Sequence, residues 1–157
     1  MAATLKILVG TMTGTADLVA EEVQAALAPK GVPVEIVQMD GLGPEVFAGG
    51  GLFLVCTSTY GQGDVPDNAR DFVDRLEAAR PALADVRYGI VALGDRTYAA
   101  TFCHGGLKFD EILTDLGAAR VGEMMLHDAS AGTMAEDEAV AWAETWIEEA
   151  WPEGAAA

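Results

Sequence analysis

Apolar runs of strand length alternate along this chain with segments whose apolar residues recur at helical spacing. The apolar runs predict five strands: Lys6–Gly10, Val32–Met39, Leu52–Thr57, Arg87–Leu93 and Arg120–His127. The helical spacing predicts four helices, at about residues 15–28, 66–76, 104–116 and 136–150. This regular alternation predicts a parallel sheet with helices on both faces.

The pattern also indicates where the strands lie in that sheet. Lys6–Gly10 is almost continuously apolar, which favours a central strand covered on both faces, whereas Val32–Met39 alternates and reads as a strand nearer an edge. With right-handed crossovers the sheet is doubly wound, and a ligand in such a sheet binds beyond the carboxyl ends of the strands. The loops after the first, third and fourth strands therefore converge on one candidate site.

Length and charge narrow the class of protein. The 157 residues predict one domain over residues 1–152, with a frayed tail at 153–157 and no targeting or membrane-spanning segment, so a cytoplasmic protein is expected. Cys56 and Cys103 are far apart and are interpreted as reduced thiols. The net charge of −16 argues against nucleic acid and anionic membranes. It fits a basic protein partner, although solubility alone explains it equally well.

The loop after the first strand is a candidate phosphate site. Residues 11–16, Thr-Met-Thr-Gly-Thr-Ala, lead from the strand into a helix whose first N–H groups have no intrahelical partner. No Lys or Arg lies between Lys6 and Lys30, so neutral hydroxyls and amides would hold the anion, unlike in G-x-x-x-x-G-K-[ST] loops. A threonine-capped first helix without a ligand is the competing interpretation.

The loops after the third and fourth strands each carry a tyrosine close to glycine. Tyr60 precedes Gly61, and Tyr98 follows Gly94 by four residues. Two aromatic rings offered from neighbouring loops can stack on both faces of a flat conjugated ring. The alternative is that both tyrosines are ordinary rim residues. A phosphate site with a ring clamp favours a mononucleotide that has a broad, planar base.

Three stretches resemble a known family. Residues 11–16 resemble the phosphate loop of flavodoxins. Residues 58–69, Ser-Thr-Tyr-Gly-Gln-Gly-Asp-Val-Pro-Asp-Asn-Ala, are similar to the FMN domains of diflavin reductases such as the sulfite reductase flavoprotein, as are residues 93–98 with Phe102, Cys103 and 106–108. The chain lacks a long insertion in its fifth strand and is most similar to short-chain, MioC-type flavodoxins. The resemblance implies an α/β, three-layer αβα fold with a five-stranded parallel sheet of order 2-1-3-4-5.

The resemblance also implies FMN as the cofactor and one-electron transfer as the activity. Tyr60 and Tyr98 would cover the two faces of the flavin, and the backbone at Gly61 would face its N5 atom. The residues that would surround the phosphate are Thr11, Met12, Thr13, Gly14, Thr15 and Ala16. The remaining contacts would come from Ser58, Thr59, Gln62, Gly63, Leu93, Gly94, Asp95, Phe102 and Cys103.

Carboxylates gather near these loops and in the C-terminal part of the chain, where no Lys or Arg follows Val121. Near the flavin they would disfavour added negative charge and steer a basic partner to it. We expect a monomer that meets a basic-faced NAD(P)H-dependent flavoprotein reductase and an acceptor redox protein. The expected partner-binding residues are Asp64, Asp67, Asp128, Glu136, Asp137 and Glu138. For those in the last helix, a solvated helix face is an equally good explanation.

Two other functions compete with the electron carrier. An FMN-containing quinone or nitro reductase would take electrons directly from NAD(P)H, but the chain leaves little length for a nicotinamide-binding domain and both flavin faces would be covered. A receiver domain would need an acidic cluster with a Lys, which the sequence does not offer. His104 and His127 lie outside any pattern typical of metal ligands.

Overall fold

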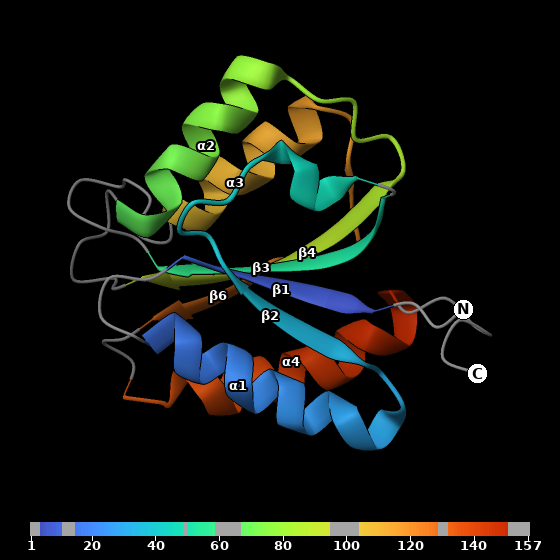
Figure 1. Ribbon diagram of the computed structural model, residues 1–157. Coiled ribbons are helices and arrows are strands. Elements are labelled where there is room, and N and C mark those ends of the chain that lie inside the picture. The colour runs from blue at the N-terminus through green and yellow to red at the C-terminus, as the bar shows by residue number, and fades with distance from the viewer. Residues whose placement is uncertain are drawn as a thin grey trace.

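A parallel sheet lies between two layers of helices in the computed structural model (Figure 1), which describes residues 4–10, 15–48, 50–58, 67–94, 104–128 and 132–150. The strands within these ranges are β1 (Leu5–Gly10), β2 (Val34–Gln38), β3 (Gly51–Ser58), β4 (Val86–Gly94), β5 (Ala119–Arg120) and β6 (Met125–Asp128). The helices are α1 (Thr15–Leu27), α2 (Asp67–Ala79), α3 (His104–Asp115) and α4 (Ala135–Ala150), with short 3-10 turns at Ala28–Lys30 and Pro44–Phe47.

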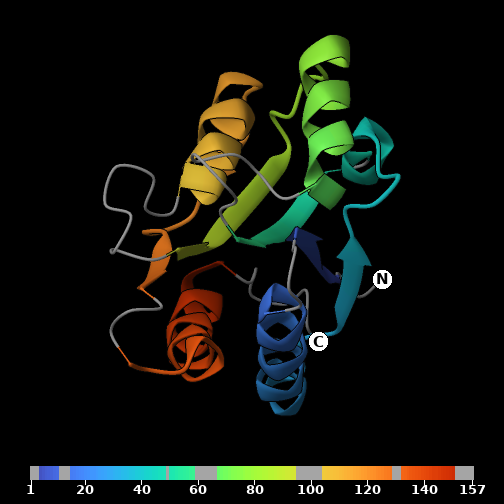
Figure 2. The ribbon, with the colours of Figure 1, turned by 90° about the vertical axis from the view of Figure 1, so that its left-hand side faces the viewer.

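The strand order is β2-β1-β3-β4-β5, with β6 also paired to β4, and all the pairs are parallel. The predicted order 2-1-3-4-5 is therefore confirmed, as is the edge position of β2. Helices α2 and α3 cover one face, while α1 and α4 lie side by side on the other (Figures 1 and 2).

The prediction of one continuous fifth strand over residues 120–127 is wrong. Between the pairs Tyr88↔Arg120 and Val91↔Met125, β4 advances three residues while the fifth strand position advances five. The two extra residues form an outward excursion that divides β5 from β6. At its start, the N–H of Val121 donates to the Tyr88 carbonyl at 2.8 Å, and Gly122 then adopts a left-handed φ of 69°.

Two indole rings of α4 hold this excursion. Trp146 donates its ring N–H to the Val121 carbonyl at 3.0 Å, and Trp142 donates to the Glu123 carbonyl at 3.3 Å. The rings stack with centroids 5.2 Å apart and planes 15° apart. The apolar spacing of residues 120–127 contains no sign of these bonds, because they come from residues more than 18 positions later in the chain.

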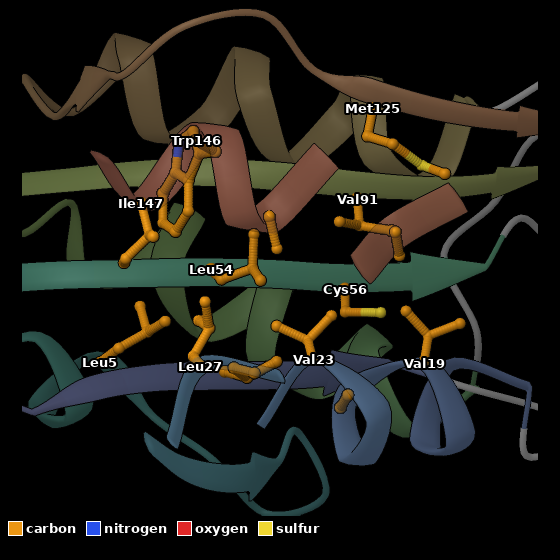
Figure 3. Packing of buried hydrophobic residues seen from close by; sticks show 14 of the residues in the cluster. Leu5, Val19, Val23, Leu27, Leu54, Cys56, Val91, Met125, Trp146 and Ile147 are labelled. Atoms are coloured by element: carbon orange, nitrogen blue, oxygen red, sulfur yellow. The ribbon is translucent and has the colours of Figure 1, made fainter. Parts of the chain in front are cut away.

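Two apolar cores, one on each face, hold the layers together. In the core between the sheet and α1 and α4, Val19, Val23 and Leu27 point from α1 towards Leu54 and Cys56 on β3 (Figure 3). On the other face the ring of Phe47 packs against the rings of Phe53 and Phe72, and Phe72 packs against Phe109. The apolar residues at helical spacing in α1, α2 and α4 are buried in these cores. None of the helices in the described ranges is long and apolar enough to cross a membrane.

Candidate functional site

The carboxyl ends of three neighbouring strands stand level with one another. Gly10, the last residue of β1, pairs with Thr57 of β3, and Ser58, the last residue of β3, pairs with Leu93 of β4. Because the chain crosses from β1 to β2 on one side and to β3 on the other, this edge contains the point where strand order reverses. In open α/β sheets, ligands bind in the crevice outside that point.

Helix α1 begins at this edge. It starts at Thr15, five residues after the end of β1, and its first N–H groups, which have no intrahelical partner, and its dipole favour an anion. Ala16 is fully buried, and the thiol of Cys56 on β3 donates to its carbonyl with Sγ 3.5 Å from the oxygen. This contact links the first turn of α1 to the sheet.

Gly10 brings the elements of this edge into close contact. A Cβ at this position would lie 2.8 Å from Oγ1 of Thr57, 3.0 Å from Sδ of Met39 and 3.2 Å from Cβ of Ala69. The end of β1 thus packs against β3, the residue after β2 and the first turns of α2 with no room for a side chain. Such crowding lets the backbone of α2 approach the strand ends.

Helix α3 approaches the same edge from the other end of the row. A Cβ at Gly106 would lie 2.4 Å from Cβ of Ala92, so α3 rests almost directly on β4 two residues before that strand ends. The first turn of α3 is therefore held beside the end of β4. Since Ser58 pairs with Leu93, β3 and β4 end side by side at this edge.

Arginines in the described part of the chain bind carbonyl and carboxylate groups elsewhere in the fold. Arg75 donates to the carbonyls of Gly41 and Leu42, and Arg87 donates to the carbonyl of Ala150 at the end of α4. Arg80 pairs with Asp115 at 2.7 Å, and Arg120 pairs with Asp110 at 2.8 Å. The first turn of α4 contains three acidic residues in succession, Glu136, Asp137 and Glu138.

A histidine contact that the sequence analysis missed lies close to this edge. His127 of β6 is buried, with 4% of its surface exposed, and its Nδ1 is 2.5 Å from Oε1 of Glu138. Because a carboxylate only accepts hydrogen bonds, the ring N–H donates to it. Eleven positions separate the two residues, and no local sequence pattern indicates the contact.

Burial shifts the pKa of two groups near the middle of the sheet. Burial, helped by the Asp17 carboxylate, raises the pKa of the Cys56 thiol to about 12, so the thiol stays protonated. Burial and its hydrogen bond to Asp110 raise the pKa of Tyr88 above its ordinary value. Cys56 is free and buried. This protonated thiol therefore serves as a packing group and a hydrogen-bond donor, not as a nucleophile.

The structure brings the described members of the predicted site to one edge. Thr15 and Ala16 begin α1, Ser58 ends β3, and Leu93 and Gly94 end β4. The side chains of Ala16 and Leu93 are buried in the core, so the backbone is what these two residues present to the edge. Outside the described residues lie Thr11, Met12, Thr13, Gly14, Thr59, Tyr60, Gly61, Gln62, Gly63, Asp95, Tyr98, Phe102 and Cys103.

The predicted partner-binding residues, like the predicted cofactor-binding residues, lie partly within and partly outside the described residues. Asp128 ends β6 and pairs with Gly94, while Glu136, Asp137 and Glu138 form the first turn of α4. Asp67 is the first residue of α2, and Asp64 lies outside the described residues. At this edge the start of α1 therefore lies beside the aligned ends of β1, β3 and β4, and acidic residues lie nearby. This arrangement fits a mononucleotide, with its phosphate at α1 and its ring along the strand ends.

Comparisons with known proteins identify the class. The flavodoxin family model matches residues 7–142. Flavodoxin YqcA of Escherichia coli (strain K12) is 40% identical over 144 residues, which cover 92% of this chain and 96% of that protein. Protein MioC of Escherichia coli (strain K12) is 33% identical over 147 residues, which cover 92% of this chain and 97% of that protein. In the solved structure of a mutant flavodoxin from Pseudomonas aeruginosa, the TM-score is 0.81 at 31% identity, covering 95% of this chain and 99% of that one.

The chain therefore belongs to the flavodoxin family. Its cofactor is FMN, and it is an electron-transfer flavoprotein rather than an enzyme with a substrate of its own. The family and cofactor expected from the three sequence motifs are confirmed.

Proposed function

We propose that the FMN phosphate binds at the first turn of α1 and that the flavin lies along the ends of β3 and β4. In this proposal residues 11–16 surround the phosphate, and Tyr60 and Tyr98 cover the two faces of the ring. The observation that supports this position of FMN is that the ends of β1, β3 and β4 are aligned beside the start of α1. Bound FMN supplies reversible electron storage, and the residues of this edge hold it and shield it from water.

We also propose that this protein receives electrons from a basic-faced NAD(P)H-dependent flavoprotein reductase and passes them singly to an acceptor redox protein. The net charge of −16 and the acidic first turn of α4 support a basic partner, because opposite charges steer two proteins into contact. Asp64, Asp67, Asp128 and residues 136–138 would form that docking surface. We propose that the protein works as a cytoplasmic monomer.

The carrier role is tested by mixing the FMN-loaded protein with NADPH under anaerobic conditions. The pure protein is expected to leave NADPH unoxidised, with or without an added quinone. Adding a catalytic amount of a basic-faced NADPH-dependent flavoprotein reductase should then bleach the bound FMN. Rapid NADPH oxidation by the pure protein in the presence of quinone would contradict the carrier role and favour a quinone reductase.

A further inference from the structure

His127 and Glu138 form a nearly buried contact between the end of β6 and the first turn of α4. The histidine ring is 4% exposed, whereas the Glu138 side chain is 45% exposed. Nδ1 of His127 lies 2.5 Å from Oε1 of Glu138, within hydrogen-bond distance. A proton on the second ring nitrogen would make this contact an ion pair inside a water-poor environment.

The pair lies beside the edge where the flavin is proposed to bind. His127 is the register partner of Leu93, and the next pair, Gly94↔Asp128, ends both strands. The imidazole is therefore attached one residue from the carboxyl end of β4. Because its ring is buried, solvent and salt screen its charge weakly, and the charge acts over a longer distance than an exposed one.

Among the described residues, the charged side chains next to His127 on β6 and in the first turn of α4 are acidic. Helix α4 and strand β4 are the elements packed most extensively against β6. Opposite His127, β4 contributes Leu93, which cannot titrate, and α4 contributes Glu138 with Glu136 and Asp137 in the same turn. Asp128 follows on β6 itself. A proton taken up by the imidazole therefore adds a positive charge to a strongly negative neighbourhood.

We propose that the His127–Glu138 pair tunes the reduction potential of the bound FMN through a charge that changes with pH. Imidazoles titrate between about pH 5 and 8. A protonated imidazole cancels the charge of the carboxylate, and a neutral imidazole leaves the pair with one negative charge. A negative charge disfavours the added electron, so the potential falls as the imidazole releases its proton to solvent; the electron itself comes from the reductase. The inference rests on the proposed position of FMN.

The test measures the midpoint potential of FMN in the loaded protein across this pH range, using His127→Gln, Glu138→Gln and the control Glu144→Gln. His127→Gln keeps the negative charge at every pH. Its potential should fall below that of the wild type at the acidic end and coincide with it at the alkaline end. Glu138→Gln removes that charge, so its potential should exceed that of the wild type at the alkaline end. Glu144 is exposed and lies six residues further along α4, and its substitution should shift the potential equally at all pH values.

Each outcome is read against the wild type at the same pH, which cancels the intrinsic pH dependence of the flavin. Curves for His127→Gln and the wild type that differ by a constant amount over the whole range would overturn the proposal, because a merely structural role predicts that result. Glu138 is half exposed, so its substitution keeps the test available if His127→Gln fails to fold. An FMN titration precedes the potentials: absence of binding contradicts the proposed site, whereas binding with constant differences contradicts this inference alone.

Discussion

Gly89 of β4 lies directly against the indole of Trp146 of α4. A Cβ at Gly89 would come within 2.6 Å of two ring carbons, and the ring N–H is already committed to the Val121 carbonyl. The missing side chain therefore lets α4 lie close to the sheet, and the indole in turn fixes the excursion between β5 and β6.

Gly89→Ala is expected to destabilise the protein by about 1–3 kcal/mol, as overpacking of a filled core does. Urea unfolding followed by tryptophan fluorescence measures this change. Ala141→Ser, at an exposed position of the same helix, is the matched control and should stay within about 0.5 kcal/mol of the wild type. Equal stability of Gly89→Ala and the control would show that α4 does not depend on this close approach.

Gly10→Ala is expected to weaken both folding and FMN binding. The added methyl would lie 2.8 Å from Oγ1 of Thr57 and 3.2 Å from Cβ of Ala69, so the end of β1 must move relative to β3 or α2. That movement displaces the start of the proposed phosphate loop. FMN affinity, measured by absorbance titration, should fall at least about tenfold, which corresponds to 1.4 kcal/mol. Unchanged affinity at reduced stability would place the phosphate away from this strand end.

The stability of the apoprotein is expected to fall with rising pH in the alkaline range. The Cys56 thiol titrates at its ordinary value of 9.0 in the unfolded chain and at about 12 in the folded one. Between these values the unfolded chain loses a proton that the folded chain keeps, so the free energy of unfolding decreases by up to about 1.4 kcal/mol per pH unit for this group.

Cys56→Ala removes this contribution. Its unfolding free energy should decline less steeply than that of the wild type above about pH 9, even though the variant is somewhat less stable at neutral pH. Urea unfolding at a series of pH values gives both slopes. Parallel slopes would mean that the thiol titrates alike in the folded and unfolded chains. Tyr88, whose pKa is also raised, remains in both proteins and adds the same slope to each.

The two tyrosines are expected to contribute separately to FMN affinity. An aromatic pair is worth about 0.5–1.5 kcal/mol beyond its buried area, so Tyr60→Ala and Tyr98→Ala should each weaken binding by about tenfold or more. Tyr88→Phe is the control, since Tyr88 is buried beneath α3 and bonded to Asp110 and Thr114. If Tyr60→Ala and Tyr98→Ala match this control, the flavin is not held between the two rings.

The architecture could be predicted well from the sequence because it depends mainly on the pattern of apolar residues. The alternation of strands and helices, the edge position of β2 and the buried faces of α1, α2 and α4 follow from apolar spacing, whereas the strand order came from the family resemblance. The convergence of the three loops followed from the rule that the carboxyl ends of parallel strands share an edge. FMN itself required the resemblance of the motifs at residues 11–16, 58–69 and 93–98.

Contacts between distant side chains account for what the sequence analysis missed. The fifth strand divides because Trp142 and Trp146 bind the carbonyls of Glu123 and Val121, and Glu138 was expected to be a docking residue although it also bonds His127. Close approaches such as that of Gly89 to Trp146 are likewise set by packing. Periodicity reports which face of an element is buried but not which polar atoms meet across it.

An absorbance titration of the purified apoprotein with FMN tests the proposed flavin site most directly. One FMN should bind saturably per chain, with a change in the flavin spectrum, and this binding should be lost when Tyr60 and Tyr98 are both replaced by Ala. A folded protein that remains colourless after incubation with excess FMN and gel filtration would contradict the proposed flavin site.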